Sequence, residues 1–152
     1  MDKKDREVRS ILVIDDDQDD YDFVTEALHE INPNISVHYV SCCEEAQPYK
    51  NYHFDLVLLD INMPQCDGFQ WLKSIREHGY HDLPIVMYTN SLSPAHIAKA
   101  YEEGANLYFS KPESFGNLIK AFNKLINLDW SNPFSITENH KMKDDYRIFQ
   151  YS

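Results

Sequence analysis

Short runs of apolar residues alternate with helical patterns along most of this chain, and no other feature limits its fold as much. Strands are expected at residues 11–14, 35–40, 56–59, 83–88 and 107–109. Helices are expected at residues 23–31, 44–49, 69–75, 93–104 and 115–126. Strands that alternate with helices in this way form βαβ crossovers and a parallel sheet covered on both faces. The sequence therefore predicts an α/β, doubly wound fold.

Local signals mark the ends of two of these helices. Ser93 followed by Pro94 combines a capping hydroxyl with a proline at the first helical position, so a helix begins there. Gly104 suits the end of the same helix, where a left-handed residue closes the last turn. The run Asn32-Pro33-Asn34 ends the first helix.

The residues that follow the strands are the best candidates for a functional site. In open α/β sheets, ligands bind beyond the carboxyl ends of the strands. The polar residues at those positions are Asp15, Asp16, Asp17, Asp60, Thr89 and Lys111. We expect these acidic, hydroxyl and amine groups to converge on one edge of the sheet.

Acidic residues are concentrated next to the first of these positions. The chain has 152 residues and a formal net charge of −11. Residues 10–49 hold ten acidic residues and no Lys or Arg, and six aspartates lie within residues 15–22. This balance argues against a nonspecific nucleic-acid binder, which needs a basic face. A solvated acidic helix start and a cation site both explain the cluster.

Carboxylates beside a lysine suit phosphoryl chemistry with a hard cation. Mg²⁺ is bound by a few carboxylate or carbonyl oxygens and keeps some waters. A lysine at the same place would bind phosphoryl oxygens, and a hydroxyl would add a hydrogen bond. Asp60 ends a buried apolar strand and is placed to accept a phosphoryl group as a nucleophile. The chain contains no Gly-rich P-loop and no G-x-G-x-x-G, so a nucleotide is not the obvious donor.

Four motifs in order resemble the response-regulator receiver domains of two-component signalling. They are ILVIDDD at 11–17, LVLLDINMPQCDG at 56–68, the strand end at Thr89, and GANLYFSKP at 104–112. The resemblance covers about residues 8–128. It implies a flavodoxin-like (βα)5 fold, with five parallel strands in the order 2-1-3-4-5 and five helices. It also implies a signalling module that is not an enzyme, apart from assisting its own phosphorylation and dephosphorylation.

The resemblance also implies a role for each acidic site residue. Asp60 would be the phosphoacceptor, which receives the phosphoryl group from the phosphohistidine of a kinase. Asp16 and Asp60 would bind Mg²⁺, or Mn²⁺, directly, and Asp15 would bind it through water. The backbone carbonyl of Asn62 would complete the protein ligands.

The remaining implied roles belong to switching and to phosphate lifetime. Lys111 would pair first with Asp60 and then with the phosphoryl oxygens, and the Lys111–Pro112 bond would be cis. The hydroxyl of Thr89 would move onto the phosphoryl group, and Tyr108 would follow it inward as an aromatic switch. Three residues are expected to modulate dephosphorylation: Asn62, Asn90 and Ser91. Asn90 departs from the family pattern, which has a small residue there.

Three regions are expected along the chain. They are an N-terminal extension at 1–8, a receiver domain at 9–128, and an aromatic-containing tail at 129–152 with no clear period and no output domain. No apolar run is long enough to span a membrane, and three cysteines without a C-x-x-C pair suit the cytoplasm. The expected partners are a sensor histidine kinase and a downstream protein, without direct DNA binding. The tail would support a homodimer.

Three other functions remain open. The chain could be a phosphorelay intermediate that passes its phosphoryl group to a histidine phosphotransfer protein. It could be a phosphohydrolase of the haloacid-dehalogenase kind, although that class needs D-x-D and here the second position is Asn62. It could also be a constitutive interaction protein with an inert site. The aspartates assigned to a solvated helix start are Asp17, Asp19, Asp20 and Asp22.

Overall fold

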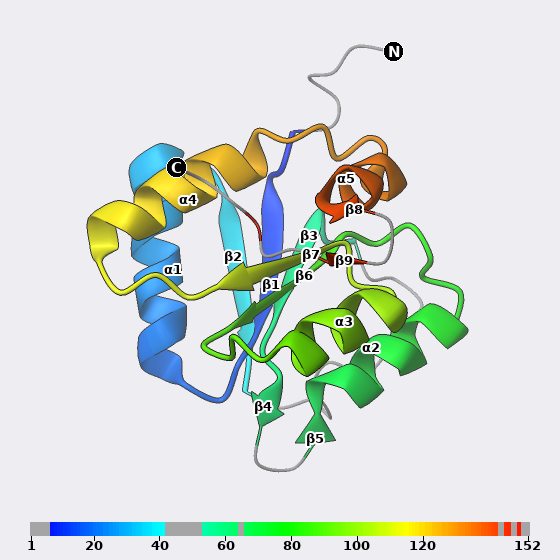
Figure 1. Ribbon diagram of the computed structural model, residues 1–152. Helices are drawn as coiled ribbons and strands as arrows, with labels where there is room; N and C mark the ends of the chain where they lie inside the picture. Colours follow the sequence, from blue (N-terminus) through cyan, green and yellow to red (C-terminus); the bar gives the residue numbers. More distant parts are fainter. Residues whose placement is uncertain (1–6, 42–52, 64–65, 143–144, 147–148, 150–152) are drawn as a thin grey trace.

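The computed structural model has a five-stranded parallel sheet at its centre (Figure 1). The structure describes residues 7–41, 53–63, 66–142, 145–146 and 149. The strands are β1 (Ser10–Ile14), β2 (Ser36–Val40), β3 (Leu56–Leu59), β6 (Ile85–Thr89) and β7 (Leu107–Ser110). Their order is β2-β1-β3-β6-β7. Counted along the chain, this is the predicted order 2-1-3-4-5.

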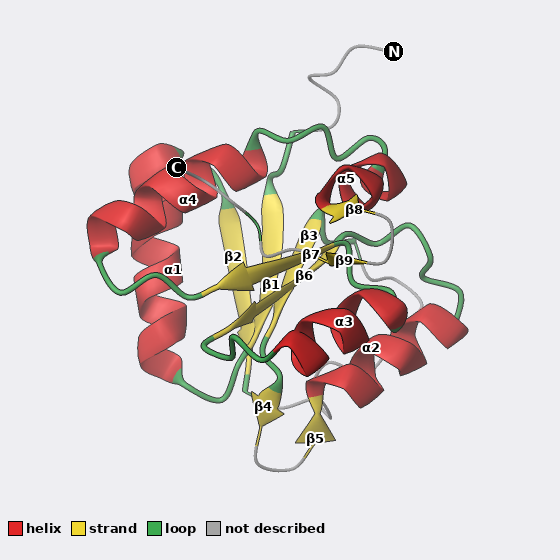
Figure 2. Ribbon diagram, viewed as in Figure 1, coloured by secondary structure: helices red, strands yellow, loops and turns green. Residues whose placement is uncertain are grey.

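Helices cover both faces of the sheet (Figure 2). On one face lie α1 (Gln18–Ile31) and α4 (Phe115–Ile126), which contact each other. On the other face lie α2 (Gly68–Glu77) and α3 (Pro94–Glu102). The helix predicted at 44–49 lies outside the described residues. None of the described helices is long and apolar enough to cross a membrane.

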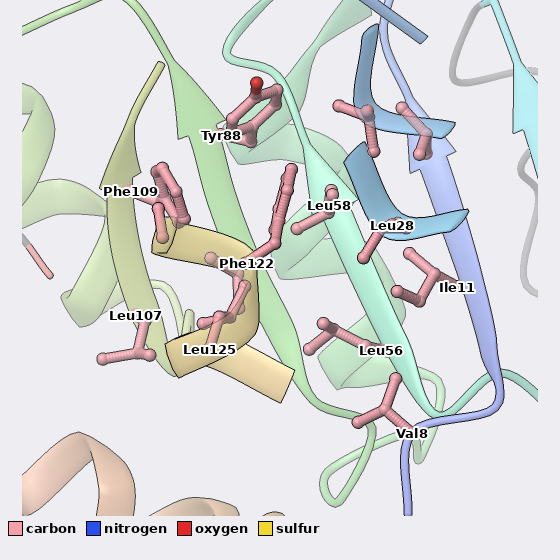
Figure 3. Close-up of a cluster of buried hydrophobic side chains, with 14 of the residues drawn as sticks. Val8, Ile11, Leu28, Leu56, Leu58, Tyr88, Leu107, Phe109, Phe122 and Leu125 are labelled. Atoms are coloured by element: carbon pink, nitrogen blue, oxygen red, sulfur yellow. The ribbon is translucent and has the colours of Figure 1, made fainter. Parts of the chain in front are cut away.

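The alternation of side chains along each strand explains two separate apolar layers. In β1, Ile11 and Val13 join the layer under α1 and α4, while Leu12 and Ile14 join the layer under α2 and α3. Figure 3 shows the first layer, where Leu58 and Phe122 lie between the sheet and the helices. A strand buried on both faces needs a continuous apolar run, which is the pattern that the sequence has.

Most predicted strand and helix limits are close to those observed, although α1 begins at Gln18, more than a turn before the helical pattern predicted at 23–31. Ser93 caps α3 by accepting the backbone N–H of His96 at 3.4 Å, and Gly104 follows the helix with a φ of 110°. β6 begins at Ile85 and not at residue 83, because Pro84 has no N–H to offer a ladder. The Pro84 carbonyl still accepts the backbone N–H of Val57.

Two local expectations differ from the structure. A short antiparallel pair, β4 (Asn62–Met63) and β5 (Cys66–Asp67), lies between β3 and α2 and was not predicted. The Lys111–Pro112 bond is trans, since the described residues contain no cis peptide bond, so the expectation of a cis bond was wrong. The trans form is the intrinsically preferred one even before proline.

The segment after α4 packs against the sheet, although its sequence has no clear period. It forms α5 (Pro133–His140) and the short strands β8 (Lys141–Met142) and β9 (Asp145–Tyr146). Trp130 and Phe149 are buried in the same apolar layer as α1 and α4. The Trp130 indole N–H donates to the Leu125 carbonyl at 2.9 Å, and the Phe149 N–H donates to the Tyr108 carbonyl at 2.7 Å.

Polar contacts hold α5 at the amino ends of the strands, far from β4 and β5 (Figure 1). The buried amide of Asn106 donates to Thr137 Oγ1 at 3.2 Å and accepts from Arg76 at 3.0 Å. Arg76 also donates to the carbonyls of Gly104 and Leu83, and burial lowers its pKa to about 10. A hollow of about 1230 Å³ lies at this end of the sheet, opposite the predicted site.

We predict that Trp130→Ala destabilises the protein by about 3–5 kcal/mol, because it leaves a cavity in the layer that Trp130 shares with the sheet. Urea unfolding of the full chain measures the change. Phe134→Ala is the matched control, since that side chain is 71% exposed against 6% for Trp130. Equal midpoints for the two variants would contradict the packing of this segment on the domain.

Candidate functional site

Three carboxylates meet at the carboxyl ends of β1 and β3. Oxygen atoms of Asp15, Asp16 and Asp60 all lie within 4.8 Å of one another. The sheet order brings them together, because β1 and β3 are neighbours with Ile14 opposite Leu59. The backbone N–H of Asp60 donates to the Ile14 carbonyl at 2.9 Å, so the first residue after β3 is fixed beside β1.

Burial disfavours the ionised form of the carboxylates in this acidic cluster. Asp15 and Asp60 are 1% and 8% exposed, while Asp16 faces solvent. Burial raises the pKa of Asp15 to about 6, and the charge of Lys111 opposes the rise. Burial also raises the pKa of Asp60, again against the charge of Lys111. Buried carboxylates that are ionised at neutral pH favour a nearby cation.

The cluster fits a divalent metal ion by its donor set. Three carboxylates within reach of one point, one of them exposed to water, match the oxygen ligands and retained waters that Mg²⁺ prefers. Asn62 lies in β4, two residues after Asp60, and its role as a carbonyl ligand stays a prediction.

Lys111 supplies the positive charge of the site. It follows β7, and its backbone N–H donates to the Thr89 carbonyl at 2.9 Å. Its Nζ lies 2.6 Å from Asp20 Oδ2, 3.0 Å from Asp15 Oδ2 and 3.8 Å from Asp60 Oδ2. Burial alone would lower the pKa of Lys111, but the hydrogen bond that Lys111 donates to Asp20 and the charges of Asp15 and Asp60 outweigh it and raise the pKa.

Thr89 and Tyr108 lie next to this charged group. Thr89 is 1% exposed, and its hydroxyl lies near Asp60, where it favours the ionised carboxylate and so opposes the rise in the pKa of Asp60. Tyr108 is fully buried, and its hydroxyl donates to the Ser91 carbonyl at 2.8 Å. Thr89, Ser91 and Tyr108 are therefore joined through the loop after β6, since the Ser91 N–H also donates to Thr89 Oγ1 at 3.3 Å.

Gly68 allows the start of α2 to approach the phosphoacceptor candidate closely. A Cβ at this position would lie 2.2 Å from the backbone oxygen of Asp60, which no side chain permits. The Gly68 N–H donates to the Ile61 carbonyl at 3.1 Å, and Asp67 caps α2 by accepting from Phe69 N–H at 2.9 Å. The sequence pattern predicts the helix that begins near residue 69, but not this steric requirement.

The other predicted modulators lie at the rim of the site. Asn90 is exposed at the end of β6. Ser91 is half-buried, and its Oγ lies 2.7 Å from His96 Nδ1 on α3. The structure thus brings together Asp15, Asp16, Asp60, Thr89 and Lys111, with Tyr108 and Ser91 beside them.

Asp20 belongs to the site although its sequence position suggested a solvated helix start. Asp17 caps α1, so Asp20 is the third helical residue and lies one turn from the cap. Its carboxylate makes the shortest ion pair of Lys111, at 2.6 Å. The assignment of Asp20 to solvent was therefore wrong. No signal in the sequence separates Asp20 from Asp19, which lies in the same helical turn and is exposed.

Comparison with known proteins agrees with this geometry. The family model for the response regulator receiver domain matches residues 11–123. The match spans β1 to α4 and includes every site residue described above.

Individual relatives are similar over most of this chain. A 112-residue stretch is 34% identical to part of the CAI-1 autoinducer sensor kinase/phosphatase CqsS of Vibrio cholerae, covering 72% of this chain and 16% of that protein. The response regulator Rre1 of Synechocystis is 28% identical over 140 residues, which cover 91% of this chain and 60% of that protein. The chain therefore spans less than two thirds of these relatives' lengths.

Solved structures share the fold. The phosphorylated cyanobacterial phytochrome response regulator RcpA superposes with a TM-score of 0.73 at 24% identity, over 82% of this chain and 95% of that one. The Mn²⁺-bound form of the response regulator Rcp1 gives a TM-score of 0.66 at 22% identity, over 82% and 96%. Motifs, strand order, site geometry and the family match agree, and this chain belongs to the response regulator receiver domain family.

Proposed function

We propose that Asp60 accepts a phosphoryl group from the phosphohistidine of a sensor histidine kinase. The observation that carries the proposal is the meeting of Asp60 with Asp15, Asp16, Thr89 and Lys111 at one edge of the sheet. A carboxylate oxygen of Asp60 attacks phosphorus and forms a P–O bond, while the P–N bond breaks and its electron pair returns to the kinase imidazole. Similarity to part of a sensor kinase supports a partner of that kind.

Asp15, Asp16 and Asp60, with the backbone carbonyl of Asn62, are the residues proposed to hold Mg²⁺ or Mn²⁺. When bound, such an ion neutralises charge on the phosphoryl oxygens. The buried carboxylates of Asp15 and Asp60 support this role, because each pays a desolvation cost that a cation would offset. The Mn²⁺-bound form of Rcp1, which has the same fold, also supports a divalent ion.

The remaining residues position the phosphoryl group and report its presence. Lys111 Nζ, 3.8 Å from Asp60, is close enough to donate to a phosphoryl oxygen after a small movement. The Thr89 hydroxyl, which lies near the Asp60 carboxylate, would donate a hydrogen bond to the phosphoryl group. Tyr108 shares the Ser91 loop with Thr89, so a shift of Thr89 would bias the packing around Tyr108.

The output proposed for this switch is protein binding through the surface of α3, β7 and α4. Tyr108 is in β7, and β7 lies at the edge of the sheet beside α3. A downstream protein, or a second copy of the chain, would bind the surface that these elements form. Receiver domains as a family act in signalling, which favours this output over catalysis on a small molecule.

We predict that Asp60→Asn abolishes phosphorylation by acetyl phosphate and Mg²⁺, because an amide oxygen is a poor nucleophile and cannot form the acyl phosphate. Intact-mass spectrometry measures the added phosphoryl group. Asp22→Asn is the matched control, since Asp22 is exposed on α1 and its loss removes the same charge. Phosphorylation of Asp60→Asn at the control level would refute the assignment.

We predict that stabilisation by Mg²⁺ depends on pH around the pKa of Asp15. That pKa of about 6 lies above the ordinary aspartate value, so the folded state binds a proton more tightly than the unfolded chain. Without metal, Asp15 therefore destabilises the fold as pH rises from about 4 through about 6. Mg²⁺ should raise the melting temperature at about pH 7.5 and do so much less at about pH 5, where protons compete. The control is NaCl of matched ionic strength. Equal shifts in melting temperature at both pH values would contradict the prediction.

We predict that Asn90→Ala shortens the half-life of the phosphorylated protein. Asn90 stands exposed at the rim, where the family has a small residue, and its removal opens the path of the attacking water. Loss of the phosphoryl group is followed by intact-mass spectrometry after removal of acetyl phosphate. Asn117→Ala, an exposed substitution on α4, is the control. An unchanged half-life in Asn90→Ala would show that this side chain does not regulate water access.

A further inference from the structure

The ammonium group of Lys111 is shared unequally among the acidic residues around it. Its shortest contact is with Asp20 Oδ2 at 2.6 Å, followed by Asp15 Oδ2 at 3.0 Å. Asp60 Oδ2, the proposed phosphoacceptor, is 3.8 Å away, beyond the range of a hydrogen bond. The lysine that is expected to bind the phosphoryl group is therefore bonded to the start of α1.

The position of Asp20 is well determined by the local structure. The N-cap at Asp17 fixes the first turn of α1, and Asp20 projects from that turn toward Lys111. The Asp20 side chain is 31% exposed, while that of Lys111 is only 9% exposed. Asp20 can thus leave Lys111 for water at a low desolvation cost, whereas Lys111 has few places to move other than toward Asp15 and Asp60.

We propose that Asp20 is a positioning residue that holds Lys111 away from Asp60 until a phosphoryl group competes for it. The inference rests on the function proposed for Asp60. A phosphoryl group brings about two negative charges and three acceptor oxygens, so it attracts the ammonium more strongly than a lone carboxylate does. Lys111 then moves from Asp20 to the phosphoryl oxygens, and the carboxylate of Asp20 is released to water.

This arrangement makes Asp20 a competitor of the phosphoryl group. Each phosphoryl group that binds must break the Lys111–Asp20 contact, which opposes binding. Removing the charge of Asp20 while keeping its shape therefore tightens the binding of a phosphoryl analogue. The contact that is lost is a charged hydrogen bond with one partly exposed partner, so we expect the affinity for the analogue to rise about three- to tenfold. A merely structural role for Asp20 would weaken binding instead.

The test is a titration of the full chain with beryllofluoride, a phosphoryl mimic, at saturating Mg²⁺. Isothermal calorimetry gives the affinity for the wild type, Asp20→Asn and Asp19→Asn. Asp19 is the matched control, because it is exposed on the same turn and its substitution removes the same charge. The hydrogen bonds of Lys111 Nζ go to Asp20 and Asp15 and not to Asp19. We expect Asp20→Asn to bind about three- to tenfold more tightly than Asp19→Asn.

A double-mutant cycle separates pairing through Lys111 from a general charge effect. In a Lys111→Gln background, Asp20→Asn should give no gain, because there is no ammonium left to release. Equal affinities of Asp20→Asn and Asp19→Asn, or the same gain without Lys111, would overturn the role of Asp20 alone. Binding of beryllofluoride that survives Asp60→Asn would instead overturn the phosphoacceptor assignment on which the inference rests.

Discussion

The pairing of β1 with β3 is the constraint on which the rest of the site depends. Two adjacent parallel strands end at the same height, so Asp15 and Asp60 are brought together whether or not their charges favour it. Their burial adds a desolvation cost to the repulsion, and both pKa values rise as a result. The free energy for this unfavourable placement comes from the apolar layers on both sides of the sheet.

Lys111 offsets part of the acidic charge that this placement concentrates. Its backbone is attached to β6 through Thr89, so the sheet places the ammonium as firmly as it places the carboxylates. The ammonium is hydrogen-bonded to Asp15 and Asp20 and lies 3.8 Å from Asp60 Oδ2, so Lys111 does not occupy the Asp60 oxygen that the proposed phosphorylation uses. Asp15 and Asp20 thus balance the charge of Lys111, while Asp60 of the same cluster is left without a hydrogen bond to it.

Periodicity and strand-end chemistry were enough to predict most of the fold and the centre of the site. The apolar runs located the strands, and the resemblance to receiver domains supplied their order. The residues just after the strands converge because strands in a parallel sheet share one direction. Residues whose role depends on a long-range contact were harder to predict. Asp20 resembled any acidic residue near a helix start, and only the placement of Lys111 distinguishes it from Asp19.

The segment after α4 shows the same limit in a different form. α5 has no clear apolar stripe, since it is held by the polar contacts of Asn106 and Thr137 as well as by Ile136. Periodicity detects helices that bury a continuous face, so it missed this one. Gly68 entered the sequence analysis only as the last residue of a motif, because its steric role depends on the backbone oxygen of Asp60, eight positions earlier.

The bond from the Phe149 N–H to the Tyr108 carbonyl has a consequence for self-association. β7 is an edge strand, and the free carbonyls of an edge strand are a template on which another chain can add a strand. The Phe149 N–H occupies one of these carbonyls, and its ring centroid lies 5.7 Å from that of Phe109 in the same strand, with the two rings tilted by 36°. Through Phe149, the chain itself thus covers part of an edge strand that could otherwise pair with another chain.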